Sequence, residues 1–131
     1  MTAVVVRIKT ITFDCADWEP LVEFWSQATG FTEDPDDPNQ PDDEEALLIA
    51  PDGSARLLFI PVPEPKQVKN RIHLDLEPID RSRDAEVERL IGIGARLVED
   101  RRNEDGTGWA VLADPEGNEF CVLRSAAERA K

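Results

Sequence analysis

His73 is the only histidine in the sequence, and imidazole is the side chain that most readily exchanges a proton near neutral pH. The segment 73–77 alternates polar residues with leucines, so a strand there would carry His73, Asp75 and Glu77 on one face. A neighbouring carboxylate favours the protonated imidazole. We expect His73 to be either a hydrogen-bonded structural residue or a catalytic proton donor or acceptor with Asp75 as its partner.

Further candidate ligand-binding residues come from the same reasoning on other segments. Thr10, Thr12 and Asp14 share one face of a predicted strand, and polar residues on an inner face indicate a wet cavity rather than a dry core. Trp109 either packs in the protein or stacks on a planar ligand. Arg56 is either a surface charge at a strand edge or a bidentate clamp for a carboxylate.

The segments that carry these residues occur twice in the chain. Residues 10–17 and 73–80 both alternate in period two and both end in an aspartate. A helical pattern follows each of them and stops at Gly30 or Gly94, where a left-handed residue is favoured. The first helix is expected to begin at Asp17, and the second at Ser82 or Asp84. Their apolar stripes are predicted to be Leu21, Phe24, Trp25 and Ala28, and Val87, Leu90 and Ile91.

Three strand-like segments are predicted after each helix. They cover residues 31–33, 46–50 and 56–62 in the first copy, and 96–101, 109–113 and 119–123 in the second. Turn sequences, PDG at 51–53 and DPEG at 114–117, separate the last two strands of each copy. The sequence therefore predicts one α+β domain, 1–131, of two βαβββ modules at about 1–66 and 67–131. The alternative is a ferredoxin-like α+β sandwich.

Composition limits the possible partners and location. A formal net charge of −13 disfavours nucleic acid and membranes as partners. There is no apolar run of about 20 residues, and the charges of the amino terminus follow its apolar patch, which is the wrong order for a signal peptide. We expect a cytoplasmic protein with Cys15 and Cys121 as reduced thiols inside strands. The acidic segment 33–45 contains prolines but no glycine, which predicts a solvated loop rather than a calcium site.

Three stretches carry a resemblance to a known family: ITFDCADWEPLVEFWSQATGF at 11–31, NRIHLDLEP at 70–78 and WAVLADPEGNEFCVL at 109–123. They resemble the glyoxalase, bleomycin-resistance and dioxygenase (vicinal oxygen chelate) superfamily, and in particular its small bacterial glyoxalase-like branch. The resemblance implies that the two modules form a half-barrel cup around a ligand. It says less about the reaction, because this fold serves several chemistries.

The resemblance also locates four positions where metal-dependent members place their ligands. In this sequence they are Thr10, Leu58, His73 and Cys121. Only His73 is a strong ligand for a divalent metal, and Leu58 offers no donor atom. We therefore expect no cofactor and no catalytic metal at these degenerate positions, with a bound divalent metal as the alternative.

Three functions follow as hypotheses. The first is a protein that binds a small organic molecule in its cup without a catalytic metal. The second is a metal-dependent lyase or isomerase of the glyoxalase type, in which His73 binds the metal or acts as a base. The third is a dimeric interaction module with a vestigial pocket, and a homodimer is expected in each case. Apart from His73, the predicted ligand-binding residues are Thr10, Thr12, Asp14, Arg56, Asp75, Trp109 and Cys121.

Overall fold

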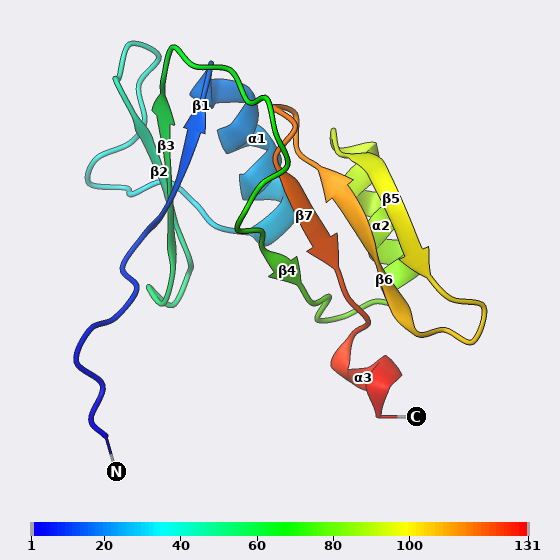
Figure 1. The fold of residues 1–131 in the computed structure, drawn as a ribbon. Helices are drawn as coiled ribbons and strands as arrows, with labels where there is room; N and C mark the ends of the chain where they lie inside the picture. The colour runs from blue at the N-terminus through cyan, green and yellow to red at the C-terminus, as the bar shows by residue number, and fades with distance from the viewer. Residues whose placement is uncertain (1, 131) are drawn as a thin grey trace. The chain divides into compact units, whose positions relative to one another are not determined.

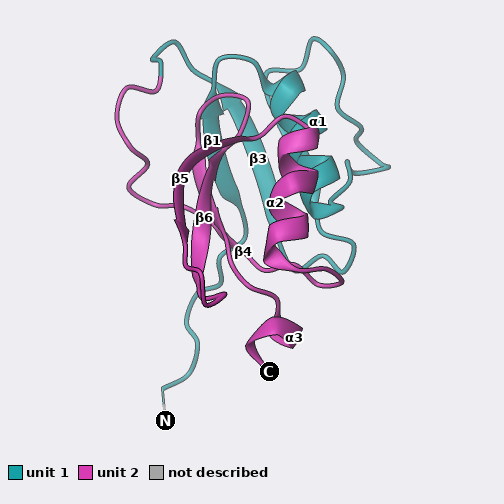
Figure 2. Cartoon of the chain, turned by 90° about the vertical axis from the view of Figure 1, so that its right-hand side faces the viewer, with its two compact units in different colours: residues 1–65 teal, residues 66–131 magenta. Residues whose placement is uncertain are grey.

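The computed structural model describes residues 2–130, so Met1 and Lys131, the ends of the predicted domain, lie outside the described residues. The chain divides into two compact units, with the boundary between Pro65 and Lys66 (Figure 2). Each unit is a helix packed on a mixed sheet, as the ribbon shows (Figure 1). The α+β prediction is therefore confirmed.

The first unit contains β1 (Ile11–Cys15), α1 (Trp18–Thr29), β2 (Ala46–Ile49) and β3 (Arg56–Pro61). Its sheet has the order β1-β3-β2, with β1 parallel and β2 antiparallel to the central β3. The helix begins as predicted, because the Asp17 side chain accepts a hydrogen bond from the backbone N–H of Glu19. It ends at Gly30, whose φ of 81° lies in the left-handed region.

The core of the first unit lies between α1 and one face of the sheet. Leu21, Phe24 and Trp25 of the predicted stripe are at most 1% exposed, whereas Ala28 is half-buried. The rings of Phe13 and Trp25 are 5.3 Å apart between centroids, within the range of aromatic packing. Successive side chains of a strand point to opposite faces of the sheet. The even-numbered residues of β1 and β3 therefore lie on the face turned away from α1.

The second unit contains β4 (Asp75–Leu76), α2 (Arg83–Gly92), β5 (Arg96–Arg102), β6 (Gly108–Ala113), β7 (Glu119–Val122) and the short helix α3 (Ala126–Arg129). Its sheet has the order β4-β7-β6-β5, with β4 parallel to β7 and the other pairs antiparallel. Its core joins α2 to one sheet face through side chains that are at most 1% exposed: Val87, Leu90, Ala110, Leu112, Phe120 and Val122.

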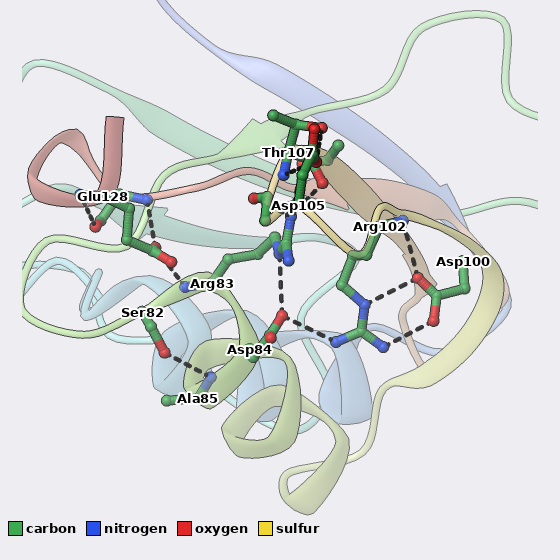
Figure 3. Close-up of polar contacts among 12 residues, drawn as sticks. Ser82, Arg83, Asp84, Ala85, Asp100, Arg102, Asp105, Thr107 and Glu128 are labelled. Carbon is green, nitrogen blue, oxygen red and sulfur yellow. Dashed lines mark hydrogen bonds and ion pairs between the residues drawn. The ribbon is translucent and has the colours of Figure 1, made fainter. Parts of the chain in front are cut away.

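A buried arginine fixes the start of α2 to the β5–β6 hairpin (Figure 3). Arg83 is 4% exposed, and its Nη1 donates to the carbonyl oxygens of Gly106, Thr107 and Gly108 at 3.2, 2.9 and 3.0 Å. Its Nε donates to Asp84, which also accepts from Arg102. These interactions tie the helix, the hairpin and β5 into one polar network.

Hydrogen bonds in and beside this network lower the pKa values of two of its carboxyl groups, those of Asp100 and Glu128. Hydrogen bonds from Arg102 lower the pKa of the Asp100 carboxyl to about 2. Glu128 of α3 accepts from the backbone N–H of Arg83 at 2.7 Å and from that of Ser125 at 2.9 Å. The pKa of Glu128 is lowered, chiefly by the bond from Ser125. The C-terminal helix is thus held to the start of α2.

Several element predictions are corrected. Residues 31–33 form no strand but a single bridge, Thr32 to Ile49, because the following residues turn back locally and pair Asp34 with Asp37. The first sheet therefore has three strands within the described residues, not four. The strand predicted at 73–80 is reduced to β4, because only Asp75 and Leu76 pair with β7.

The second helix also differs in detail from its prediction. Ser82 rather than Asp84 is its N-cap, since the Ser82 hydroxyl accepts from the backbone N–H of Ala85 at 3.1 Å. The helix ends at Gly92 with Ile93 as C-cap, one residue before Gly94. Ile91, placed in the apolar stripe, is 38% exposed.

The remaining expectations concern the loops and thiols. Cys15 and Cys121 are free and buried within strands, as predicted. The acidic segment 33–45 is mostly exposed, in agreement with a solvated loop, but Asn39 exchanges two hydrogen bonds with the backbone of Leu47. No helix among residues 2–130 has the length and apolar character needed to cross a membrane.

Candidate functional site

The face of the second sheet turned away from α2 carries the residues with the most usable chemistry. Strand register places Asp75 beside Cys121 and Cys121 beside Val111, so these three side chains share a face. Trp109 lies two residues from Val111 along β6 and therefore projects from the same face. We call this face the second open face; it carries the accessible side chains of His73, Asp75 and Trp109 and the buried side chains of Val111 and Cys121.

Three donor groups converge at one edge of the second open face. His73 precedes β4, and its Nδ1 lies 3.9 Å from Asp75 Oδ1 and 3.9 Å from Cys121 Sγ. The candidate ligand atoms of all three residues lie within 4.8 Å of one another. The side chains of His73 and Asp75 are 39% and 56% exposed, whereas Cys121 is buried. Solvent or a ligand can therefore reach the imidazole and the carboxylate.

Burial, and then the nearby Asp75, raise the pKa of the Cys121 thiol. A thiol in this environment keeps its proton near neutral pH and is a poor nucleophile, because the thiolate is the reactive form. Cys121 therefore serves the cluster as a small apolar residue with a weak hydrogen-bonding group rather than as an attacking group.

A second set of contacts holds the segment before His73 on β7. Glu119 of β7 accepts from the backbone N–H of Asn70 at 2.8 Å and pairs with Lys66 at 3.0 Å, while its own N–H donates to Asn70 Oδ1 at 3.0 Å. Burial by itself raises the pKa of the Glu119 carboxyl, but Asn70 and Lys66 outweigh it, and the net shift is downward. This clamp fixes the segment that leads into His73.

Trp109 is positioned by backbone contacts at the start of β6. It is 43% exposed, whereas Trp18 and Trp25 are 8% and 1% exposed. The preceding Gly108 has φ 89°, and a Cβ there would lie 2.0 Å from the carbonyl oxygen of Arg101. Only glycine permits this approach, and the Gly108 carbonyl also accepts from Arg83. An accessible indole on a well-held backbone is suited to stacking.

The corresponding face of the first sheet, which we call the first open face, carries different groups. Thr12 pairs with Leu58 and Asp14 with Ile60, so these residues lie on the face turned away from α1. Arg56 occupies the same face near the start of β3 and is half-buried. Its Nε is buried and has no hydrogen-bond partner among the described residues. Continuing the register places Thr10 beside Arg56.

The sequence-predicted residues thus fall into two groups. His73, Asp75, Trp109 and Cys121 share the second open face, whereas the other group belongs to the first unit: Thr10, Thr12, Asp14, Arg56 and Leu58. Sequence reasoning missed Arg83 and the Glu119 clamp. A lone arginine at a helix start carries no recognisable signal. The Asn70–Glu119 pairing is a contact between residues distant in sequence, which periodicity does not predict.

The donor set of the second open face fits some metals better than others. One imidazole, one carboxylate and one thiol are ligands of the kind zinc accepts. They do not fit manganese or magnesium, which prefer oxygen ligands. The first unit adds no strong donor at its matching positions, Thr10 and Leu58. Three such donors would leave an open position on zinc, as in catalytic zinc sites, and binding would require the Cys121 thiol to lose its proton.

The architecture, a helix on a mixed sheet built twice from one repeat, defines the class of protein. Solved structures of the glyoxalase, bleomycin-resistance and dioxygenase (vicinal oxygen chelate) superfamily share this fold. The glyoxalase-like domain family matches residues 10–123. The chain therefore belongs to the glyoxalase-like domain family.

Individual structures are similar in fold at low sequence identity. FosX, a fosfomycin resistance protein from Listeria monocytogenes, is 13% identical with a TM-score of 0.71, covering 96% of this chain and 95% of that one. That protein was solved as a mutant with Mn(II) and 1S,2S-dihydroxypropylphosphonic acid. FosX from Mesorhizobium loti is 15% identical with a TM-score of 0.66, covering 97% and 98%.

A third structure, a glyoxalase/bleomycin resistance protein/dioxygenase family enzyme from Burkholderia phytofirmans, is 21% identical with a TM-score of 0.63, covering 87% and 94%. Comparison of the sequence with curated proteins finds no match. The structural likenesses therefore establish the fold, and the chemistry must be argued from this chain's own residues.

Proposed function

We propose that this protein binds a small organic molecule on the second open face without a catalytic metal. The observation that carries the proposal is the convergence of His73, Asp75 and Cys121 on the same sheet face as the exposed Trp109. An aromatic surface with a few convergent polar groups is typical of small-molecule sites. Similarity to FosX and to other superfamily members supports a small-molecule role but does not identify the ligand.

The polar groups favour a ligand that donates hydrogen bonds. A carboxylate such as that of Asp75 accepts hydrogen bonds, and its Oδ1 lies 3.9 Å from His73 Nδ1, beyond hydrogen-bond distance. Trp109 lies two strands and two residues from Asp75, which is roughly 12 Å between backbone positions. A planar molecule with a donor group spans this distance once the two side chains reach toward it. We propose a planar ring bearing hydroxyl or amino donors.

Any catalysis on this face would use His73. Its imidazole is accessible, and an adjacent acid can support the protonated form during a proton transfer. We propose that His73 orients the ligand or exchanges a proton with it, while Asp75 positions the imidazole. This makes an acid–base reaction possible, and binding does not depend on it.

The binding proposal can be tested with metal-free protein and catechol, a planar ring with two hydroxyl donors. Catechol is expected to quench Trp109 fluorescence with saturation, and 1,2-dimethoxybenzene, which lacks the donors, is expected to bind at least tenfold more weakly, as a lost charge-assisted hydrogen bond implies. Asp75→Asn should weaken binding of catechol, and Trp109→Phe should remove the signal. Equal affinity for both compounds, or an Asp75→Asn variant that binds normally, would contradict the proposal.

The donor cluster favours one second candidate, a lyase or isomerase of the glyoxalase type that uses a divalent metal. His73, Asp75 and Cys121 would hold the metal, which would polarise a substrate oxygen when bound. Metal content by plasma mass spectrometry, with thermal shifts in zinc and manganese, distinguishes the two candidates. A stoichiometric metal whose stabilisation disappears in His73→Ala would favour the lyase or isomerase over the metal-free binder.

We also propose a cytoplasmic location. The two free and buried thiols, Cys15 and Cys121, support it because they suit a reducing compartment. Fractionation of the cells that produce the protein tests this directly, and recovery outside the cytoplasm would overturn it.

A further inference from the structure

The charged residues at the end of β5 are divided between the two faces of the second sheet. Asp100 and Arg102 join the polar network at the start of α2 (Figure 3). Side chains alternate along a strand, so Glu99 and Arg101 project from the opposite side, which is the second open face. The register agrees, because Arg101 pairs directly with Trp109. β5 therefore adds an ion pair to the face on which the ligand is proposed to bind.

Arg101 lies directly beside the exposed indole of Trp109. Residues opposite each other on antiparallel strands have Cβ atoms about 5 Å apart, so the guanidinium and the indole can contact the same small molecule. Both groups are accessible, since the Arg101 side chain is 58% exposed and Trp109 is 43% exposed. A ring stacked on Trp109 therefore has a cation within reach on the side of β5.

Glu99 positions the guanidinium without saturating it. Its Oε1 lies 2.7 Å from Arg101 Nε. Glu99 is opposite Val111 on β6. Val111 lies in the same cross-strand row as Cys121 and Asp75, so the ion pair draws the guanidinium toward that row. A guanidinium has five N–H donors in a planar fork, so a contact at Nε leaves its terminal nitrogens able to bind a carboxylate.

The surface that separates Arg101 from Asp75 is apolar. Val111 and Cys121 are 5% and 6% exposed. Continuing the register of β6 and β7 places Leu123, which is half-buried, beside the indole. An apolar surface with a cation at one edge and a carboxylate at the other is complementary to a ring that carries unlike groups at its two ends.

We propose that the ligand is an aromatic acid, whose carboxylate binds Arg101 and whose hydroxyl or amino donors bind Asp75 at the opposite end of the ring. This inference rests on the proposed function and names the class of ligand. Arg101 is then a residue that determines specificity. The acid binds in one orientation only, because a carboxylate placed at Asp75 would meet a like charge.

The dimensions of the second open face agree with such a ligand. Arg101 and Asp75 are separated by three strand spacings and two residues, which is roughly 16 Å between backbone positions. A benzene ring with groups at opposite ends, and a hydrogen bond of about 2.8 Å at each of them, covers most of this distance. The long side chain of Arg101 covers the rest.

The acidic net charge of the chain does not prevent binding of an anion at Arg101. A charge of −13 repels anions at long range, but salt at about 0.15 M screens exposed charges beyond about 8 Å. A carboxylate in contact with the guanidinium lies within that distance. Glu99, the acidic group beside it, is itself paired with Arg101. The local cation therefore decides the affinity.

The proposal is tested by calorimetry of metal-free protein with 3,4-dihydroxybenzoate and with its methyl ester, at neutral pH and about 0.15 M salt. The two probes share the ring and both hydroxyl groups and differ in charge. The acid is expected to bind at least tenfold more tightly, as a charge-assisted hydrogen bond implies. Arg101→Gln should bring the two affinities to within about twofold of each other and leave the affinity for the ester unchanged.

Arg96→Gln is the matched control. Arg96 is also an exposed residue of β5, and it pairs with Ala113 on the same sheet face. Ala113 lies four residues along β6 from Trp109, roughly 13 Å away. The control removes the same charge from the chain without removing the group that binds the carboxylate, so the tenfold preference for the acid should persist. An equal loss of preference in both variants would overturn the proposal.

Two further results would overturn the proposal: equal affinity of the unchanged chain for acid and ester, or a preference for the acid that survives in Arg101→Gln. Asp75→Asn separates this inference from the proposed function, because it should weaken binding of both compounds. If it does so while acid and ester bind equally, the face binds a neutral ring and only the inference fails. If neither compound binds the unchanged chain, the proposed function fails as well.

Discussion

The two units of this protein begin from nearly the same sequence pattern and differ most on the face that each sheet turns away from its helix. The first open face carries two threonines, an aspartate and an arginine spread along the strands, with Leu58 between them. The second open face brings His73, Asp75 and Cys121 within 4.8 Å of one another. The buried faces, in contrast, are both packed aromatic and aliphatic cores.

This difference shows that the repeat preserves the fold and not the chemistry. The helix-facing residues must fill a core in both units, which restricts them to apolar side chains of suitable volume. The outward-facing residues are free of that restriction, so one copy can hold a close cluster of donor groups while the other holds polar and aliphatic groups spread along its strands. The site is therefore expected to depend mainly on the second unit.

The largest predicted effect tests the equivalence of the two cores. Phe59→Ala in the first unit and Phe120→Ala in the second each remove a side chain that is at most 1% exposed. Each is expected to lower the free energy of unfolding by about 3–5 kcal/mol through lost burial and the cavity left behind. Urea unfolding followed by circular dichroism measures both. A cost below about 1 kcal/mol in one unit would show that its core is loosely packed.

The next largest loss of stability comes from a contact that is expected only in the second unit. Arg83→Met leaves three hairpin carbonyls without their donor and is expected to cost about 2–4 kcal/mol. The repeat places Pro20 at the corresponding position of α1, so the first unit has no such tie. Arg81→Met, at an exposed neighbour, is the control and should change stability by less than about 1 kcal/mol. Equal costs in chemical unfolding would contradict the role of Arg83.

The two turns that precede the last strands provide a smaller contrast. Asp114 is 1% exposed and accepts from the N–H groups of Glu116 and Asn118 and from the Asn118 side chain. Asp114→Ala is expected to cost about 2 kcal/mol. Asp52 in the first unit is exposed, and its side chain bonds to Ser54 alone within residues 2–130, so the stability of Asp52→Ala should be indistinguishable from that of the unchanged chain. Thermal melts measure the stability of both variants. An equal loss of stability in Asp114→Ala and Asp52→Ala would contradict the predicted difference between the two turns.

The smallest predicted effect is a change with pH in the stability that the Glu119 clamp before His73 contributes. The pKa of Glu119 is lowered from its ordinary 4.5, so its pairing with Lys66 stabilises the folded chain above about pH 4.5. That contribution is lost as the pH falls through the lowered pKa, because both states then bind the proton. Glu119→Gln should therefore be less stable near pH 6, with the difference shrinking toward pH 3. A difference that is independent of pH would contradict the assignment.

Much of the fold was predictable because local patterns determine it. The N-cap at Asp17, the left-handed Gly30 and the buried Phe24 and Trp25 follow from spacing and residue type alone. The strand at 31–33 failed because its residues have strand character while the acidic segment after them turns back on itself. Tertiary context overrode propensity there.

The site was predictable only in part. Alternation grouped Thr12 with Asp14, which share a strand face. The family resemblance, rather than periodicity, named both His73 and Cys121 as ligand positions, and His73 Nδ1 lies 3.9 Å from Cys121 Sγ. Neither pattern could reveal that Arg83 reaches the carbonyl groups before Trp109 or that Asn70 clamps Glu119. These contacts depend on how distant segments pack, which periodicity does not encode.

The central claim is that the second open face, rather than the first, binds the ligand without a metal. Its most direct test is a titration of metal-free, nitrogen-15-labelled protein with catechol, followed by amide chemical shifts. The account predicts shifts concentrated at residues 73–77, 109–111 and 119–123, and much smaller shifts at the same catechol concentration in Asp75→Asn. Shifts confined to residues 10–14 and 56–60, or binding that appears only after zinc is added, would contradict it.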